Sequence, residues 1–414
     1  MIKEKKKLKI TNAINFIILM GIVSMFSDMT HEGAKSIYGA FLELLGASVQ
    51  TISLVSGLGE FIGCSLILLT SYIENKTKKF WLSTYIGYII NVLAIPALAL
   101  SSEKGWIFAV VMILMERVGR AIRKPAKNTL VSFAGADVGA GKAFALQEFL
   151  DQLGAFIGPL ILTLTLSLKG GLSTYNSYRL CFLILGIPAL ITLGFLVFAS
   201  LKYPHPDLSF EQKSKEETEE NTKSKFKITK TFIFYIIAIS LSAIGFIDYP
   251  VITLYINSLG IVDVKYLPLF YSLAMLSDAV AALVFGNLFD KYGIKILAVS
   301  TIFSMMFSLF IFIGHSLPMI VIGSVLWGVG MGAQESILKS AVTILIPKNN
   351  RAIGFGIFEF SFGLFWFIGS YIIGVLYEVS LVWLIIFSCG FEALSLPFYL
   401  LSSRKNTKDL KKTL

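Results

Sequence analysis

Long apolar runs recur along the whole of this 414-residue chain and constrain its fold more than any other feature. Residues 14–27, 106–115, 178–201 and 381–401 are examples. With its flanks, each run approaches the roughly 20 residues that a helix needs to cross an apolar layer about 30 Å thick. Only 15% of the residues are charged, whereas a soluble domain carries roughly 25%. Because the backbone finds no water to bond within lipid, such a chain is expected to fold as a bundle of membrane-spanning helices.

We expect about twelve of these helices, and therefore an all-α integral membrane protein. Their approximate ranges are 12–44, 49–72, 80–101, 106–130, 142–168, 178–201, 230–258, 266–289, 294–314, 317–346, 352–376 and 380–402. The first is expected to be retained, because Asp28 and Lys35 follow its apolar run where a signal peptide would carry small residues. The three cysteines all lie in apolar segments, which predicts neither a disulfide framework nor a metal site, and no cofactor is expected.

The basic residues alternate in abundance from one connection to the next. One set of connections, with the helix ends that border them, both termini and the central segment, holds 29 of the 36 Lys and Arg residues, and the alternate set holds 4. Connections rich in Lys and Arg remain in the cytoplasm. Both termini are therefore expected to be cytoplasmic in a multi-pass cell-membrane protein. The net charge of +10 then reflects topology and not a nucleic-acid partner.

The chain also divides into two similar halves. Residues 203–229 are charged and poor in apolar residues, which predicts a cytoplasmic linker between an N-terminal bundle (1–202) and a C-terminal bundle (230–414). A shift of 211 residues relates Glu148 to Glu359 and 156–158 to 367–369, and a weaker correspondence relates 26–28 to 246–248. Parallel six-helix repeats predict two pseudo-symmetric bundles with the substrate site between them near the middle of the membrane.

The connection between the eighth and ninth expected helices carries a charged motif with two glycines. Residues 286–295 read Gly-Asn-Leu-Phe-Asp-Lys-Tyr-Gly-Ile-Lys, which resembles the cytoplasmic signature G-x-L-x-D-[RK]-x-G-x-[RK] of the major facilitator superfamily. The resemblance implies a latch between conformations formed by Gly286, Asp290, Lys291, Gly293 and Lys295. The alternative is a tight glycine turn with cytoplasmic lysines. The equivalent stretch at 71–79 keeps the acid and the basic residues but lacks both glycines.

Other stretches resemble the same superfamily. Gly154, Gly158 and Pro159 in the fifth helix are similar to its antiporter motif, without the closing glycines, and Arg117 stands where the family has a buried Arg. Three polar clusters resemble a prokaryotic branch of the superfamily: Asp28 with Glu32, Glu116-Arg117 through Pro125, and Gln334-Glu335 with Lys339. The resemblance covers essentially the whole chain and implies a secondary transporter.

Charged residues at membrane depth are functional candidates, because each costs roughly 2.5–3.5 kcal/mol there. The candidates for substrate binding or proton coupling are Asp28, Glu32, Lys35, Arg117, Glu148, Asp151, Glu335, Lys339 and Glu359. For each of them the alternative is a place at a helix end or in a structural ion pair. Arg123, Lys124 and Lys127 are instead expected to anchor the fourth helix at the membrane interface.

The spacing of the candidates indicates which of them act together. Asp28, Glu32 and Lys35 recur at steps of three and four residues, so they share one helical face with His31. Glu148 and Asp151 are three residues apart. Neighbouring acids hinder each other's ionisation, which suits proton coupling, and the alternative for both is pairing with cations of the fourth helix. Glu335 and Lys339 are four residues apart in the order that favours a helix pair, and Glu359 matches Glu148 by repeat.

The sequence therefore predicts a monomeric secondary active transporter of a small solute, coupled to protons, with export by antiport slightly favoured over uptake by symport. No Gly-x-x-x-x-Gly-Lys-[Ser/Thr] loop occurs, so ATP is not the expected direct driver. The alternatives from other classes are a membrane-embedded enzyme and a sensor derived from a transporter. Acids spread over both halves disfavour the enzyme, and short tails disfavour the sensor.

Overall fold

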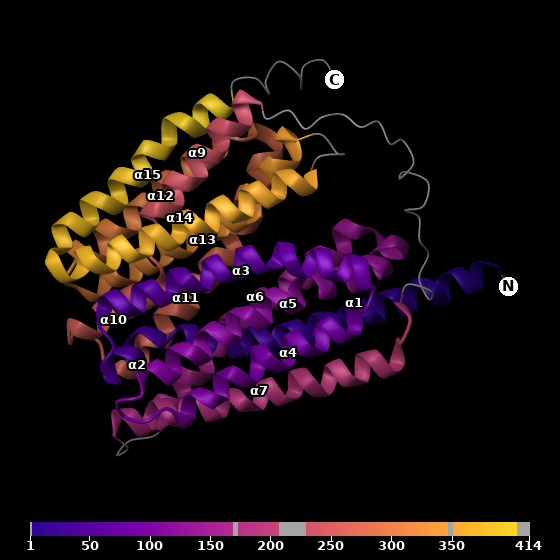
Figure 1. Cartoon of the computed structure of the whole chain (residues 1–414), viewed down its shortest axis with the longest axis horizontal. Helices are drawn as coiled ribbons and strands as arrows, with labels where there is room; N and C mark the ends of the chain where they lie inside the picture. The colour runs from indigo at the N-terminus through magenta and orange to yellow at the C-terminus, as the bar shows by residue number, and fades with distance from the viewer. Residues whose placement is uncertain (1, 169–172, 207–228, 347–350, 404–414) are drawn as a thin grey trace. The chain divides into compact units, whose positions relative to one another are not determined.

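The structure is a computed structural model that describes residues 2–168, 173–206, 229–346 and 351–403 (Figure 1). The regular structure of these residues is helical, and no strand occurs among them, which confirms the all-α prediction. The predicted linker falls mostly on residues 207–228, which lie outside the described residues.

The first half of the chain forms α1 (Ile2–Lys35), α2 (Tyr38–Leu44), α3 (Val49–Thr77), α4 (Phe80–Ala97), α5 (Trp106–Val138), α6 (Ala140–Leu168) and α7 (Thr174–Lys202). The second half forms α9 (Lys230–Gly245), α10 (Tyr249–Ser258), α11 (Leu267–Tyr292), α12 (Lys295–Ile313), α13 (Leu317–Leu345), α14 (Arg351–Val379) and α15 (Leu381–Ser403). Short 3-10 turns follow α4 at Leu98–Leu100 and precede α11 at Val264–Tyr266.

Eleven stretches among the described helices are long and apolar enough to cross a membrane. The helix α5 is not among them, although it has 33 residues, because acidic and basic residues crowd its middle. Counted with α5, the described part of the chain has twelve stretches of membrane-spanning length, the number of helices that the sequence predicts. The charges that set α5 apart are those of the candidate site described below.

Two helices that we expected to be continuous are interrupted. The predicted helix 12–44 is broken at Ser36 and Ile37, and the predicted helix 230–258 is broken at 246–248. At the second break the backbone N–H of Tyr249 donates to Asp248 Oδ1 at 2.8 Å, so Asp248 caps α10. Pro250 follows in the first turn, where its missing N–H is tolerated. The prediction was wrong here because hydropathy responds to apolar length and not to a cap inside an apolar run.

The helix breaks follow the internal repeat. Tyr38 begins α2 and Tyr249 begins α10, and these residues are 211 positions apart, the same shift that relates the halves in sequence. Glycine contacts repeat in the same way: a Cβ on Gly158 would lie 3.0 Å from the backbone N of Gly33, and a Cβ on Gly369 would lie 2.6 Å from Ile244 Cα. The weaker correspondence of 26–28 with 246–248 does not mark the breaks, because 26–28 lies inside α1.

The chain forms two compact units that do not coincide with its two halves. The first unit contains 1–34, 66–101 and 107–223, and the second contains 35–65, 102–106 and 224–414. Thus α2 and the first part of α3 pack with helices of the second half, and Gly39 of α2 lies against the backbone of Pro250 in α10. The bundle limits at 202 and 230 remain a prediction.

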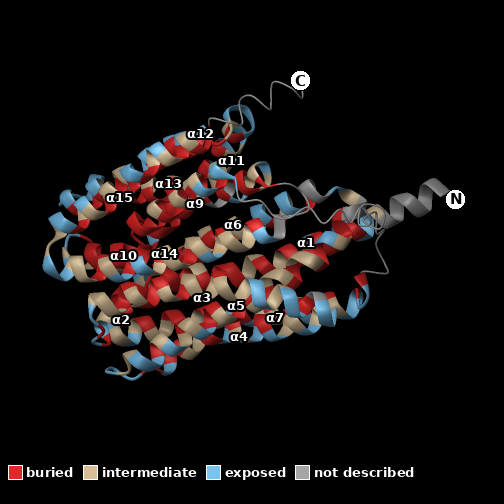
Figure 2. Ribbon diagram, turned by 45° about the horizontal axis from the view of Figure 1, so that its top comes forward, coloured by how far each residue is buried: buried red, intermediate tan, exposed pale blue. Residues whose placement is uncertain are grey.

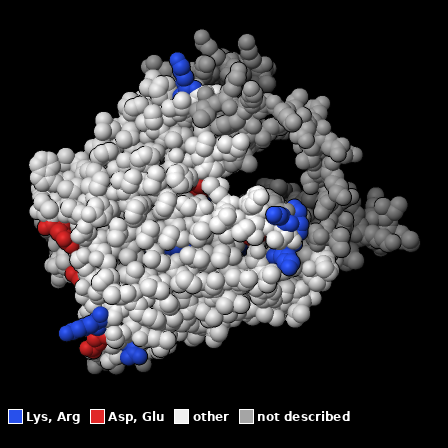
Figure 3. All heavy atoms as spheres, in the orientation of Figure 1, with Lys and Arg blue, Asp and Glu red and all other residues white. Residues whose placement is uncertain are grey.

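The outer faces of the helices are apolar. Large side chains are exposed along α7 and α15, among them Leu183, Ile187, Leu190, Trp383 and Ile386. Exposed and half-buried positions line one side of α4, α7 and α15 in Figure 2, and the face shown in Figure 3 is almost entirely uncharged. A surface of this kind suits contact with lipid tails, as expected for a membrane protein.

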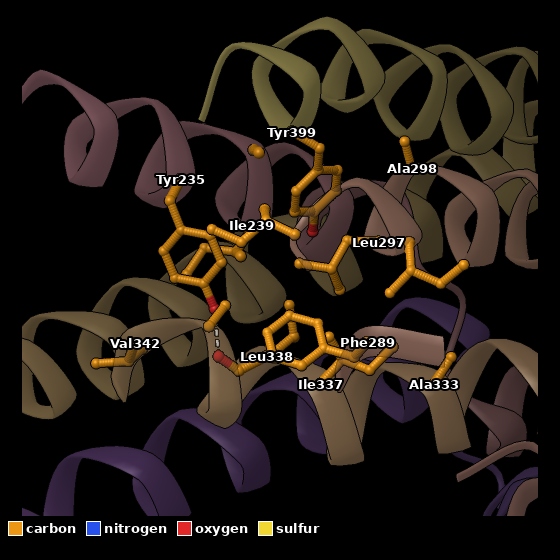
Figure 4. Packing of buried hydrophobic residues seen from close by; sticks show 14 of the residues in the cluster. Tyr235, Ile239, Phe289, Leu297, Ala298, Ala333, Ile337, Leu338, Val342 and Tyr399 are labelled. Atoms are coloured by element: carbon orange, nitrogen blue, oxygen red, sulfur yellow. Dashed lines mark hydrogen bonds between the residues drawn. The ribbon is translucent and has the colours of Figure 1, made fainter. Parts of the chain in front are cut away.

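An apolar core of the second unit lies where α9, α11, α12, α13 and α15 meet (Figure 4). Phe289, Leu297 and Ile337 fill its centre, and Tyr235 and Tyr399 enter it from α9 and α15. The Tyr235 hydroxyl donates to the carbonyl oxygen of Leu338 at 2.6 Å. That hydrogen bond satisfies the polar end of a ring that is otherwise surrounded by apolar side chains.

Candidate functional site

The polar face of α1 is buried within the first unit. Asp28 and His31 are buried there, and Glu32 is half-buried. All three side chains contact basic residues of α5. The first unit therefore brings together the acids of one helix and the cations of another, which sequence spacing within a single helix cannot show.

His31 lies at the centre of these contacts. Its Nδ1 is 2.8 Å from Glu116 Oε1, and its Nε2 is 2.8 Å from Nη1 of Arg120. A guanidinium only donates hydrogen bonds, so Nε2 must accept one. The hydrogen of a neutral ring then sits on Nδ1, the atom that faces Glu116. Arg117 approaches the same carboxylate, with its Nε 3.5 Å from Oε2.

Arg123 connects three helices. Its guanidinium lies 3.3 Å from Asp28 Oδ1, donates to Asn91 Oδ1 at 3.1 Å, and donates to the Tyr88 hydroxyl at 3.1 Å. The guanidinium carbon also stands 4.5 Å from the centre of the Tyr88 ring. Asn91 extends the chain of contacts, because its Nδ2 donates to Glu116 Oε1 at 2.5 Å. Asp28 and Glu116 are thus linked through one arginine and one asparagine.

Lys127 forms the other end of this network. Its Nζ lies 3.3 Å from Asp151 Oδ2 on α6 and donates to Ser24 Oγ on α1 at 2.5 Å. Arg123 and Lys127 are both buried, so the prediction that they anchor α5 at the membrane interface is wrong. The reason is that Asp28 and Asp151 reach them from other helices. Lys124 is half-buried.

We call these side chains the α5 charge network. Its ionic members are Asp28, His31, Glu32, Glu116, Arg117, Arg120, Arg123, Lys127 and Asp151. Sequence reasoning had not singled out Asn91 and Tyr88. The sequence does contain a pattern that could have indicated them: the polar side chains at 84, 88 and 91 are spaced to share one face of α4. All three are buried in the structure.

Lys35 belongs to a different cluster, inside the second unit. Its Nζ is 3.5 Å from Asp248 Oδ1 and 6.0 Å from the centre of the Trp327 ring. Asp248 also accepts a hydrogen bond from Ser56 Oγ. The cation thus sits at the break between α9 and α10, where Trp327 Nε1 donates to the carbonyl of Ile247 at 2.9 Å.

The remaining charged candidates lie in other surroundings. Glu148 is exposed and accepts a bond from Gln152 Nε2 at 3.4 Å, Glu359 is half-buried, and Lys339 is exposed. The side chain of Glu335 lies outside the described residues. Of the nine candidates, the structure brings Asp28, Glu32, Arg117 and Asp151 together.

The glycine motif ends α11 at a tight turn. Gly293 has a φ of +67°, a conformation that favours glycine, and its N–H donates to the carbonyl of Phe289 at 2.7 Å. Asp290, Lys291 and Lys295 are exposed around this turn, and Gly286 is half-buried. The turn explains why a glycine stands at position 293. The proposed role of this motif as a latch between conformations remains a prediction.

The antiporter-like motif packs α6 on α1. A Cβ on Gly154 would collide with the carbonyl of Met25, and a Cβ on Gly158 would collide with that of Met29. Glycines four residues apart let two helix backbones approach closely. Pro159 lies inside α6, and its carbonyl accepts a bond from Thr163 Oγ at 3.1 Å.

The Major Facilitator Superfamily profile matches residues 10–313 and 249–413, which together cover most of the chain. The chain belongs to the Major Facilitator Superfamily. An uncharacterised protein of Mycobacterium tuberculosis is 32% identical over 385 residues, 93% of this chain and 92% of that protein. An MFS-type transporter of Methanocaldococcus jannaschii is 29% identical over 373 residues, 88% of this chain and 89% of that protein.

Solved structures of this superfamily share the fold. A mutant of the nucleoside transporter NupG has a TM-score of 0.74 at 14% identity, covering 94% of this chain and 99% of that one. A bacterial homologue of the human lysosomal transporter Spinster, inward-facing, has a TM-score of 0.73 at 12% identity, covering 96% and 98%. A mutant peptide transporter with sulfate bound has a TM-score of 0.71 at 14% identity, covering 95% and 94%. The protein is thus a multi-pass membrane transporter of the MFS type.

Proposed function

We propose that this transporter exports a small solute across the cell membrane in exchange for protons and works as a monomer. The observation that carries the proposal is the α5 charge network, in which four acids and four basic side chains with one histidine meet inside a membrane bundle. Burial of so many charges is costly and is typical of ion and substrate pathways. The antiporter-like motif in α6 supports exchange over symport.

Asp28 is the proposed proton-coupling residue. It is buried, and Arg123 is 3.3 Å away. A proton on Asp28 would weaken this pair, while Asn91 and Tyr88 would still hold the guanidinium in place. The guanidinium would then be free to attract another negative or polar group. Protonation and solute binding are coupled in this way through a single cation.

Glu32 and Arg120 are the proposed solute contacts. Arg120 Nη1 is 4.0 Å from Glu32 Oε1, and the Arg120 side chain is 31% exposed, whereas the Arg117 side chain is 7% exposed. The network is therefore most accessible at Arg120. A carboxylate beside a guanidinium suits a solute that carries both a donor and an acceptor.

The proposal is tested in proteoliposomes that contain a pH-sensitive dye. Nucleosides, short peptides and amino acids serve as the first panel, because fold relatives include a nucleoside transporter and peptide transporters. At least one solute should drive a proton flux in the opposite direction to its own movement. A flux in the same direction would replace antiport by symport, and silence with every solute and with further panels would contradict proton coupling.

Neutral variants then identify the coupling residue. Asp28→Asn should keep solute counterflow but lose pH-driven accumulation, because it mimics the protonated acid permanently. Glu148→Gln is the matched control, since Glu148 is exposed, and it should behave like the wild type. Glu32→Gln should weaken counterflow itself. If Asp28→Asn accumulates solute at the wild-type level, the assignment of Asp28 is wrong.

A further inference from the structure

Glu392, another buried acid, lies in the second unit, outside the α5 charge network. Glu392 is the middle residue of α15, and Ser304 is the middle residue of α12. Both are fully buried, and Ser304 Oγ donates to Glu392 Oε1 at 3.2 Å. Because α12 and α15 are each long enough to cross a membrane, their middle residues lie deep in the apolar layer.

Glu392 has no cation beside it among the described residues. None of their ion pairs includes Glu392, and its Oε2 lacks a hydrogen-bond partner. The described part of α15 contains no Lys or Arg, while α9 and α12 carry theirs, Lys230 and Lys295, as first residues. Lys295 is nine residues from Ser304, or about 14 Å along a helix.

The other titratable groups near Glu392 are uncharged. Cys389 and Tyr399 are the nearest titratable residues on its own helix. The residues of α9 and α12 that contact Glu392 are Gly245 and Ser304, which do not titrate. The helix α14 also packs on α15. Those titratable residues of α14 whose side chains the structure describes form no hydrogen bond or ion pair with Glu392: Glu359, Tyr371, Tyr377 and Glu378.

The polar side chains around the carboxyl are small and neutral. Ser395 Oγ donates to the carbonyl oxygen of Glu392 at 2.7 Å, and Ser308 Oγ is 3.2 Å from Cys389 Sγ. Ser388, one turn before Glu392, is fully buried, and its Oγ lacks a hydrogen-bond partner. An ionised carboxylate in such surroundings is far more costly than a carboxylic acid, so the group takes up a proton.

Glu392 also touches the end of the interrupted helix. Gly245 is the last residue of α9, directly before the break. A Cβ there would lie 3.0 Å from Glu392 Cγ and 2.7 Å from the carbonyl oxygen of Ser388. The backbone of α9 therefore packs against the Glu392 side chain directly before the break between α9 and α10. A shift of this helix end would admit water to Glu392.

We propose that Glu392 is a proton-binding residue that gives up its proton when the end of α9 at Gly245 moves away from α15. This site is separate from the α5 charge network. Its role in transport rests on the proposed proton coupling, whereas its protonation does not. The break between α9 and α10 then links proton release to a change in helix position.

Infrared spectroscopy of the purified protein in lipid tests the site without solute or gradient. The wild type should show the carbonyl band of a protonated carboxylic acid at neutral pH, and the difference spectrum between the wild type and Glu392→Gln should contain that band. Glu148→Gln, which alters an exposed acid, should retain it. Glu392→Asp retains an acid and should shift the frequency of the band. This variant provides the test if Glu392→Gln does not fold.

Gly245→Ala tests the link to α9. The added methyl group should force the helix end away from Glu392, hydrate the carboxyl and make the band disappear at a lower pH than in the wild type. The proposal is overturned if Glu392→Gln removes none of the band, or if the band of Gly245→Ala titrates like that of the wild type. Failure of the proposed function would look different, because the band would remain while no solute drives a proton flux.

Discussion

A single guanidinium holds α1, α4 and α5 together in the first unit. Arg123 reaches Asp28, Asn91 and Tyr88 at 3.1–3.3 Å and stacks on the Tyr88 ring. These contacts use the planar fork of arginine, which the point charge of lysine cannot reproduce. At this site, then, the geometry of the cation matters in addition to its charge.

We predict that Arg123→Lys destabilises the protein almost as much as Arg123→Met. Removal of one partner from a buried ion pair costs about 3–5 kcal/mol, because the other charge is left uncompensated. Thermal unfolding in detergent measures the effect, and Lys104→Met in an exposed connection is the control, with a change within about 0.5 kcal/mol. Adding Asp28→Asn to Arg123→Met should restore part of the loss. Full stability of Arg123→Lys would show that charge alone is enough.

At the scale of helices, the antiporter-like motif has a packing role that is independent of any function. Gly158 of α6 lies against the Met29 carbonyl and the Gly33 backbone of α1, so a side chain has no room there. A Cβ added to Gly194 of α7 would meet nothing within 4 Å. Both glycines lie inside helices, but Gly158 is tightly packed and Gly194 has free space beside it.

Gly158→Ala should therefore lower the unfolding temperature, and Gly194→Ala should leave it unchanged or raise it. Forcing extra atoms into a packed interface costs about 1–3 kcal/mol. A compatible Gly→Ala substitution gains about 0.4–1 kcal/mol through the unfolded chain. Thermal unfolding of both variants in the same detergent gives the comparison. Equal behaviour of the two would mean that α6 and α1 are not in close contact.

The sequence predicted the helices whose position depends on apolar length alone. It did not predict the features that depend on a particular contact. Eleven of the twelve long stretches follow from apolar length, and the twelfth, α5, is apolar only in its first part. The break at Asp248 depends on the Asp248 cap and on Pro250. Hydropathy averaged over a membrane-length stretch does not show these two residues, because the residues around them are apolar. The ion pairs of Arg123 and Lys127 depend on residues of α1 and α6 that are distant in sequence. Spacing within α5 shows only its own neighbours, so it predicted an interfacial anchor.

At the scale of the whole molecule, the charges of the connections determine orientation. The partition of 29 to 4 basic residues between alternate connections predicts cytoplasmic termini. Four of the 29, Arg120, Arg123, Lys124 and Lys127, lie inside α5, and without them the partition of 25 to 4 still gives the same prediction. The prediction places two exposed lysines on opposite sides of the membrane: Lys104 in the connection before α5, and Lys291 near the end of α11. Both are suited to labelling.

Cysteine labelling in intact cells tests the orientation. In a background where Cys64, Cys181 and Cys389 are replaced by serine, Lys104→Cys should react with a membrane-impermeant maleimide added outside. Lys291→Cys should react only after the membrane is permeabilised, because translocating its basic loop would be unfavourable. The two variants control for each other, since both positions are exposed. Labelling of Lys291→Cys from outside, with Lys104→Cys protected, would reverse the topology and place both termini outside the cell.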